Sequence, residues 1–252
     1  MLKAILFDMD DTLIDWGDFS GNWERLEIPH IEAVYQHLCT LGEIQGGLEV
    51  FSKEYFMRTR TAWFKAHNSL IAPHVGRVLT ETAIHLGIPQ DNLDIRACLD
   101  AYGWGRITGV SLFPEVIDSL KLLRDKGLRF GIITNAYQPM WMRDVELEHY
   151  GLMEFFPECR FSAADFGYLK PHPDIFTHAL DCLGVTAEEA VFIGDNPTAD
   201  IAGAQAVGMK GVLRVIKRMA PLISGLIVPD AAINTLEELP AVLSEWYPGW
   251  DQ

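Results

Sequence analysis

The chain has 252 residues, of which 49% are hydrophobic and 22% charged, the composition of a globular protein long enough to bury a sizeable core. Its net charge of −15, with no run of basic residues, argues against nucleic acid as a partner, because phosphate-backbone binding needs a concentrated Lys/Arg surface. The start of the chain lacks the apolar segment of a signal peptide, and no apolar run approaches the roughly 20 residues that span a bilayer. With four scattered cysteines, these features predict a cytoplasmic protein with reduced thiols and no membrane partner. The sequence leaves open whether the protein is a monomer or a homodimer.

The first segment combines a buried strand with a cluster of acids. Residues 2–7 are almost entirely apolar, which is typical of a parallel strand covered on both faces, and Asp8, Asp10 and Asp11 follow directly. Acids at this position lie at the carboxyl edge of a sheet, where open α/β folds bind ligands. Asp8 and Asp10 leave the same face of an extended backbone, and two such carboxylates repel each other unless a cation or a shared proton intervenes. Taken alone, the stretch is equally compatible with a solvated turn.

The next part of the chain is predicted to be purely helical. Between about residues 16 and 104, apolar residues recur at three- and four-residue steps in four successive stretches, which predicts four amphipathic helices. These helices are predicted to begin near Pro29, Leu48, Pro73 and Pro89. Such helices can bury their apolar stripes against one another as a small bundle. Four aromatic residues are assigned mainly to the interior of this bundle: Trp23, Phe56, Trp63 and Phe64.

From about Phe113 the sequence alternates between helices and strands. Strands are predicted at 128–134, 159–162, 190–194, 210–215 and 231–233. One helix is predicted to begin at Pro114 and stop at Gly127, and a second to follow the strand at 128–134 and end at about Tyr150. Three more are predicted over 174–183, 198–207 and 236–246. This alternation predicts an α/β fold, a Rossmann-like parallel sheet with helices on both faces, plus the inserted all-α bundle. We expect a core domain of residues 1–16 and 106–252 and a helical cap of residues 17–105.

A polar residue capable of chemistry follows each of three later strands. Thr134 and Asn135 end one strand, Lys170 lies in the loop after the next, and Asp195 and Asp200 follow the third. Each has a structural explanation of its own: a helix cap, a solvated lysine, or carboxylates at a helix start. Because parallel strands end along one edge of a sheet, however, we expect Asp8, Asp10, Thr134, Lys170 and Asp195 to meet in one pocket.

Four polar segments therefore follow one another in a defined order. They read Asp8-Met-Asp10-Asp11-Thr12, Ile-Thr134-Asn135, Leu-Lys170-Pro171 and Gly194-Asp195-Asn-Pro-Thr-Ala-Asp200. In this order they resemble the four motifs of haloacid dehalogenase superfamily hydrolases of the phosphatase type. The inserted helices are similar to the cap that this family carries between its first and second motifs. One departure is Asp11, where many members have glycine.

The resemblance implies a magnesium-dependent phosphohydrolase that forms an aspartyl-phosphate on Asp8. A phosphate monoester is a dianion, so attack by a carboxylate needs a cation that bridges nucleophile and phosphoryl oxygens. The implied Mg²⁺ ligands are Asp8, Asp195 and the main-chain carbonyl of Asp10, an all-oxygen set. Asp10 is the implied catalytic acid/base, which protonates the leaving oxygen and later takes a proton from water.

The remaining motif residues are implied to bind the phosphoryl group. Thr134 and the main-chain N–H of Asn135 would donate hydrogen bonds to it, and the catalytic Lys170 would supply positive charge. Asp200 would support the site by orienting Lys170 or a metal-bound water. The implied partner is a small phosphorylated metabolite, and sugar phosphates, short phosphorylated acids and nucleotides all fit the sequence. Trp16 and Tyr137 are expected in the outer wall of the pocket.

Other activities share these core motifs. A phosphomutase keeps them and is one alternative. A dehalogenase needs the nucleophile but neither magnesium nor a proton donor to an ester oxygen, so Asp10 argues against it. The non-enzymatic alternative is a phospho-acceptor or other regulatory protein that uses Asp8 without turnover. A large inserted bundle has no use in such a switch and favours the enzyme.

Overall fold

A six-stranded parallel sheet forms the centre of the computed structural model, which describes residues 1–17, 19, 21–216 and 226–252. The strand order is β5-β4-β1-β6-β7-β8, and every neighbouring pair is parallel. The strands are β1 (Ala4–Phe7), β4 (Arg129–Thr134), β5 (Arg160–Ser162), β6 (Ala190–Gly194), β7 (Lys210–Arg214) and β8 (Ala231–Ile233). The predicted α/β fold class is confirmed, with the first strand at the centre of the sheet.

Both faces of the sheet are covered, as the apolar first strand predicts. Ile5 and Phe7 of β1 belong to one apolar core and Ala4 and Leu6 to the other, so alternate side chains point to opposite faces. The first core is closed by α5 (Val116–Asp125), α6 (Met140–His149) and α10 (Leu239–Trp246). The second is closed by α8 (Pro173–Leu183) and α9 (Ala202–Ala206). A short helix, α7 (Ala163–Phe166), follows β5.

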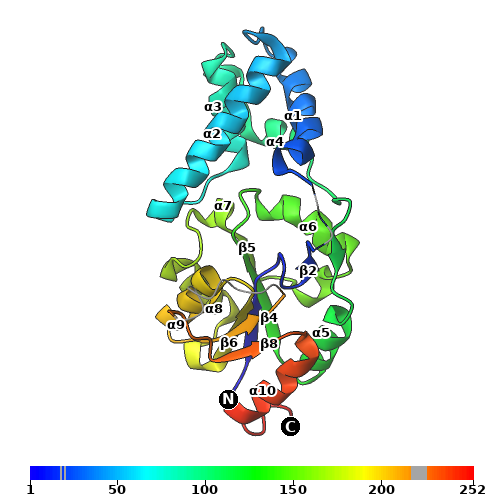
Figure 1. Cartoon of the computed structure of the whole chain (residues 1–252), viewed down its shortest axis with the longest axis vertical. Coiled ribbons are helices and arrows are strands. Elements are labelled where there is room, and N and C mark those ends of the chain that lie inside the picture. Colours follow the sequence, from blue (N-terminus) through cyan, green and yellow to red (C-terminus); the bar gives the residue numbers. More distant parts are fainter. Residues whose placement is uncertain (18, 20, 217–225) are drawn as a thin grey trace.

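Four helices form a second unit, which we call the helical unit, beyond the carboxyl edge of the sheet (Figure 1). They are α1 (Trp23–Cys39), α2 (Gly47–Ser69), α3 (Val75–His85) and α4 (Ile95–Tyr102). Each packs against its neighbours in the unit, α1 against α2 and α4, and α3 against α2 and α4. Both chain termini lie at the opposite end of the molecule, beyond the sheet (Figure 1). The boundaries of core and cap at residues 17 and 105 stay a prediction.

Two helix starts in this unit differ from the prediction. The first helix begins at Trp23 rather than near Pro29, because Asn22 caps it by accepting a hydrogen bond from the Glu24 N–H at 2.8 Å. Pro29 lies inside the helix. The fourth begins at Ile95, after a short 3₁₀ turn at Gln90–Asn92.

The sequence did not predict a second, two-stranded sheet. Strands β2 (Ile14–Asp15) and β3 (Ser111–Leu112) pair antiparallel where the chain leaves the large sheet and where it returns to it. The helix predicted over 198–207 is also divided, into a π-helical turn at Pro197–Ile201 and α9. Short 3₁₀ turns occur at Met153–Phe155, Ala187–Glu189 and Leu236–Glu238. Among the described residues, no helix combines the length and apolarity needed to cross a membrane.

Arg214, at the end of β7, connects the sheet to the segment after β1. It is buried, and its two terminal nitrogens donate hydrogen bonds to the Thr12 carbonyl at 2.9 Å and to Glu115 Oε1 at 2.6 Å. The guanidinium also lies 3.8 Å from the centre of the Phe113 ring. A buried cation therefore holds the loop that carries the first acids, through the main-chain carbonyl of Thr12.

Candidate active site

The seven predicted site residues line one cavity of about 560 Å³. These residues are Asp8, Asp10, Thr134, Asn135, Lys170, Asp195 and Asp200. The cavity lies between the carboxyl ends of the strands and the helical unit. The structure therefore brings together side chains from four different strand ends, as expected from the parallel sheet.

The seven polar residues at the strand ends form what we call the floor of the cavity, and the charge of Lys170 lies at its centre. Its ammonium nitrogen lies 2.6 Å from Asp8 Oδ1 and 2.7 Å from Asp200 Oδ1, and all three side chains are buried. Burial acts to lower the pKa of Lys170, but the charges of Asp200 and Asp8 outweigh it and raise the pKa. The lysine is thus held as a cation between two carboxylates.

Asn135 positions Lys170 through its side chain. Its Oδ1 accepts a hydrogen bond from the Lys170 N–H at 2.8 Å, and its Nδ2 donates one to the Lys170 carbonyl at 3.1 Å. Only a main-chain role was predicted for Asn135. These two hydrogen bonds hold the loop that follows β5 against the end of β4, and they thereby fix the position of the Lys170 main chain.

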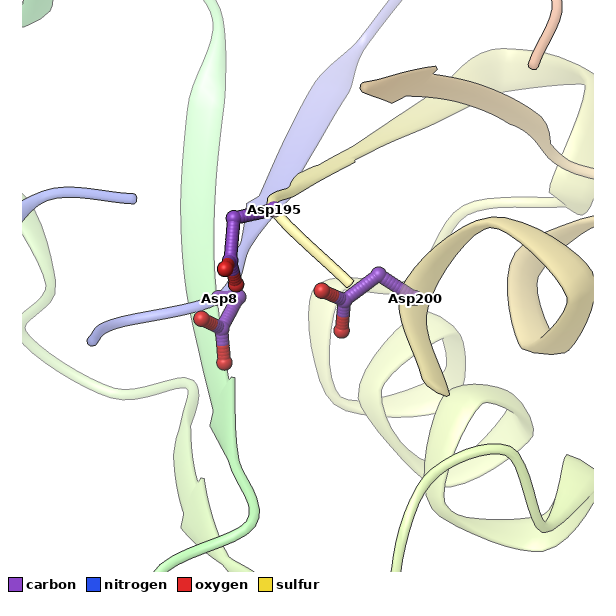
Figure 2. Close-up of side chains that lie close together, drawn as sticks. All are labelled: Asp8, Asp195 and Asp200. Carbon is purple, nitrogen blue, oxygen red and sulfur yellow. The ribbon is translucent and has the colours of Figure 1, made fainter. Parts of the chain in front are cut away.

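Three carboxylates gather beside Lys170. Figure 2 shows Asp8, Asp195 and Asp200 converging from the end of β1, the end of β6 and the π-helical turn, and one oxygen of each lies within 4.8 Å of the others. Burial and the neighbouring acids raise the pKa of Asp8 well above its usual range, although Lys170 opposes them. Burial, together with Asp200 and Asp11, raises the pKa of Asp195 to about 7. This crowded all-oxygen set fits a hard divalent cation, whose charge would relieve the repulsion.

Gly194 makes room for this arrangement. A Cβ atom at this position would lie 2.2 Å from Asp200 Oδ2 and 2.6 Å from the Asp200 Cβ. Asp200 is held there by the Asn196 N–H, which donates to Oδ2 at 2.9 Å. The glycine of the fourth motif is therefore required by the close approach of the Asp200 side chain.

Asp11 occupies a backbone conformation that explains the family's usual glycine. Its φ is 58°, in the left-handed region that glycine enters freely and that aspartate tolerates better than most residues. Its Oδ1 accepts a hydrogen bond from the Trp16 N–H at 3.2 Å. The departure from the family pattern is accommodated by a side chain that stabilises its own turn.

Arg143 is a site residue that the sequence did not reveal. This buried side chain of α6 donates from its two terminal nitrogens to Asp10 Oδ2 at 3.1 Å and Oδ1 at 2.6 Å, and its Nε donates to Glu146 at 2.5 Å. Trp16 Nε1 also donates to Asp10 Oδ1 at 2.9 Å, and the Thr134 hydroxyl lies 3.4 Å from Oδ2. Burial would raise the pKa of Asp10, but Arg143 outweighs it and lowers the pKa. Asp10 is therefore a carboxylate in this structure.

Aromatic side chains form the wall opposite the acids. Trp16 and Tyr137 line the cavity, as predicted. The assignment of the aromatic residues of α1 and α2 mainly to the bundle interior is right only in part: Phe56 and Trp63 pack against the apolar core, but they and Trp23 also line the cavity. Phe64 is 73% exposed. An apolar helical stripe has the same pattern whether it faces another helix or a cavity, which is why the sequence did not show that these residues line the cavity.

A buried carboxyl group lies within this wall. Glu27 of α1 is 5% exposed, and its Oε1 accepts hydrogen bonds from the Tyr137 hydroxyl and, at 3.4 Å, from the Tyr102 hydroxyl. The Tyr55 hydroxyl lies 3.1 Å from that of Tyr137. Burial raises the pKa of Glu27 to about 7. Since Tyr137 follows β4, this cluster joins the helical unit to the sheet.

Comparison with known proteins agrees with this geometry. The family model of haloacid dehalogenase-like hydrolases matches residues 2–208, and the chain belongs to this family of hydrolases. It is similar to a glyceraldehyde 3-phosphate phosphatase of Methanocaldococcus jannaschii, with 30% identity over 95% of this chain and 96% of that protein. Two solved structures are also similar, each with a TM-score of 0.61. One is a HAD phosphatase from Thermococcus onnurineus, 26% identical over 96% of this chain and 98% of its own. The other is a 2-haloacid dehalogenase from Pseudomonas syringae pv. Tomato DC3000, 27% identical over 98% of this chain and 100% of its own.

The titration of Glu27 predicts a pH-dependent stability. Its pKa rises from an ordinary 4.5 to about 7 on folding, so the folded state binds the Glu27 proton more tightly than the unfolded state does. The resulting contribution to the free energy of unfolding is complete below pH 4.5 and is lost as the pH rises through 7. Relative to Glu27→Gln, which cannot titrate, we expect the free energy of unfolding of the wild type to fall by about 3 kcal/mol between pH 4.5 and 8. Urea unfolding at several pH values measures this. Glu32→Gln, an exposed change on the same helix, should keep the wild-type pH dependence. A constant difference between wild type and Glu27→Gln contradicts the prediction.

Proposed function

We propose that the chain is a magnesium-dependent phosphatase that hydrolyses a small phosphorylated metabolite through an aspartyl-phosphate on Asp8. The observation that carries the proposal is the buried Lys170 cation between Asp8 and Asp200, with a second acid, Asp10, in the same cavity. A carboxylate beside a fixed cation suits attack on a dianionic phosphoryl group. The phosphatases among the similar proteins support the same reaction class.

The residues of the cavity floor would bind the phosphoryl group. Lys170 would supply charge, and the Thr134 hydroxyl and the Asn135 N–H would donate hydrogen bonds. Asp8, Asp195 and the Asp10 carbonyl would hold Mg²⁺, whose charge, when bound, offsets that of the phosphoryl oxygens and the attacking carboxylate. Asp200 would keep Lys170 in place through the ion pair at 2.7 Å.

The reaction would proceed in two steps on this floor. In the first, an oxygen of Asp8 bonds to phosphorus while the ester P–O bond breaks, and Asp10 gives a proton to the leaving alcohol. In the second, water attacks the phosphoryl group, Asp10 takes its proton, and the Asp8–phosphorus bond breaks to release phosphate. Arg143 holds Asp10 in the form that accepts a proton. A phosphoryl group beside Asp10 would raise its pKa and favour the protonated form that the first step needs.

The helical unit would act as a cap over this floor. Its aromatic side chains, from α1 and α2, line the same cavity as the acids. Closure over the phosphoryl group would exclude bulk water during the first step and strengthen every electrostatic contact inside. We assign residues 17–105 to this cap.

Two other reactions of the family are alternatives to phosphate hydrolysis. A dehalogenase would have no use for a metal ligand such as Asp195 or for a proton donor such as Asp10. A phosphomutase would keep the floor and would transfer the phosphoryl group to a second hydroxyl instead of water. Release of inorganic phosphate distinguishes the phosphatase from both.

The first prediction concerns the nucleophile. With 4-nitrophenyl phosphate, the wild type should turn over many times with Mg²⁺ and lose activity with a chelator, and Asp8→Asn should lose at least about a thousandfold in kcat, because an amide is a poor nucleophile. Asp15→Asn, the same change in β2, is the control and should keep wild-type activity. Wild-type activity in Asp8→Asn, or a persistent stoichiometric phospho-protein without turnover, would contradict the proposal.

The second prediction concerns Gly194. In Gly194→Ala the new methyl group would push Asp200 away from Lys170, so we expect a loss of about 1–3 kcal/mol in stability and at least about tenfold in kcat. Urea unfolding and the same assay measure the two effects. Gly105→Ala is the matched control, because a Cβ at Gly105 meets nothing within 4 Å. Equal behaviour of the two variants would show that the close approach of Asp200 is not required.

A further inference from the structure

The cations that line the cavity are all paired with carboxylates of the chain itself. Within the described residues they are Arg60, Arg143 and Lys170. Lys170 and Arg143 lie at the floor and each contacts two carboxylates. Arg60 is on α2, is 66% exposed at its side chain, and pairs with Glu24 at 2.5 Å. Among the described residues that line the cavity, the helical unit therefore contributes one cation, Arg60, and two carboxyl groups, Glu24 and Glu27.

The helical unit instead presents an acid to the cavity. Glu27 lines it, and the described partners of its Oε1 are the hydroxyls of Tyr137 and Tyr102 rather than a cation. A carboxylate accepts about four hydrogen bonds, so Glu27 keeps the capacity to accept from a ligand. The aromatic side chains Trp16 and Trp63 also line the cavity and provide apolar surface for a carbon chain.

We infer that Glu27 selects the organic part of the substrate: a phosphate monoester whose far end carries a hydrogen-bond donor, hydroxyl or ammonium, and no second anionic group. The inference rests on the proposed phosphatase function and adds the substrate class. A donor at the far end would give its hydrogen bond to the Glu27 carboxylate. A carboxylate at that end would meet Glu27 as a like charge, with the cavity cations already paired, and would be rejected.

Three esters of similar size test this selection. Glycerol 3-phosphate ends in a hydroxyl, 3-aminopropyl phosphate in an ammonium, and 3-phosphoglycerate in a carboxylate. The assays are run with Mg²⁺ at pH 8, above the pKa of about 7 to which burial raises Glu27, so that its carboxyl group is ionised. In the wild type, kcat/KM for at least one donor-terminated ester should exceed that for 3-phosphoglycerate by about tenfold or more, which is the effect of one hydrogen bond to a charged group. The hydroxyl and ammonium esters show which donor is preferred.

The variant Glu27→Gln keeps the size of the side chain and removes its charge. We expect it to lower the ratio of kcat/KM for the donor-terminated esters to kcat/KM for 3-phosphoglycerate by about tenfold. The KM for the donor-terminated esters should rise, and the KM for 3-phosphoglycerate should fall. If Glu27 had a purely structural role, the variant would instead lower kcat/KM for all three esters by a similar factor and leave their ratio unchanged. Glu32→Gln, on the exposed face of α1, is the matched control and should keep the wild-type ratio.

The outcomes separate the inference from the proposed function. The wild-type ratio tests the inference even if Glu27→Gln fails to fold, which circular dichroism would show. Equal kcat/KM values for the three esters, a preference for 3-phosphoglycerate, or an unchanged ratio in a folded Glu27→Gln overturns the inference while phosphatase activity stands. If 4-nitrophenyl phosphate, which has neither a donor nor a second anion, is not hydrolysed with Mg²⁺, the proposed function fails and the inference fails with it.

Discussion

The buried ammonium of Lys170 is the interaction on which the rest of the site depends. It lies 2.6 Å from Asp8 and 2.7 Å from Asp200, so it joins the loop after β5 to the ends of β1 and β6. A buried charge is tolerated only when it is paired, and removing either partner leaves an uncompensated charge at high cost. The two ion pairs hold these three segments together and place a carboxylate beside a fixed cation.

The acidic segment of residues 8–12 is held by buried cations from three separate elements. Lys170 pairs with its first carboxylate, Arg143 of α6 with its second, and Arg214 of β7 donates to the last carbonyl. Lys170 and Arg143 thereby offset the repulsion between Asp8 and Asp10, while Arg214 fixes the main chain at Thr12. After this segment the chain passes through β2 before α1 begins at Trp23.

The two units of the molecule contribute different side chains to the cavity. The floor carries buried Lys170 and Arg143 and the acids of the candidate metal site, whereas α1 and α2 contribute aromatic side chains, the Arg60–Glu24 pair and the carboxyl group of Glu27. A phosphoryl group fits the floor for electrostatic reasons, and the organic part of an ester would lie against the wall. Substitutions in α1 and α2 would alter the selectivity for the organic group of the substrate without moving the acids of the floor, because Glu27 and those acids lie on different elements.

The sequence alone determined the features that depend on local pattern. Apolar runs and turn residues predicted each strand of the large sheet, and parallel strand ends predicted that five polar residues, Asp8, Asp10, Thr134, Lys170 and Asp195, would share a pocket. Only the tertiary structure decided which side chains complete the site. Arg143 has the spacing of an ordinary surface helix pair with Glu146, and its burial follows from contact with an acid 133 residues away. Glu27 meets Tyr137 across 110 residues, and Trp23 faces the cavity rather than the bundle interior. Helical periodicity shows that a face is buried, but what it packs against depends on how distant segments are brought together.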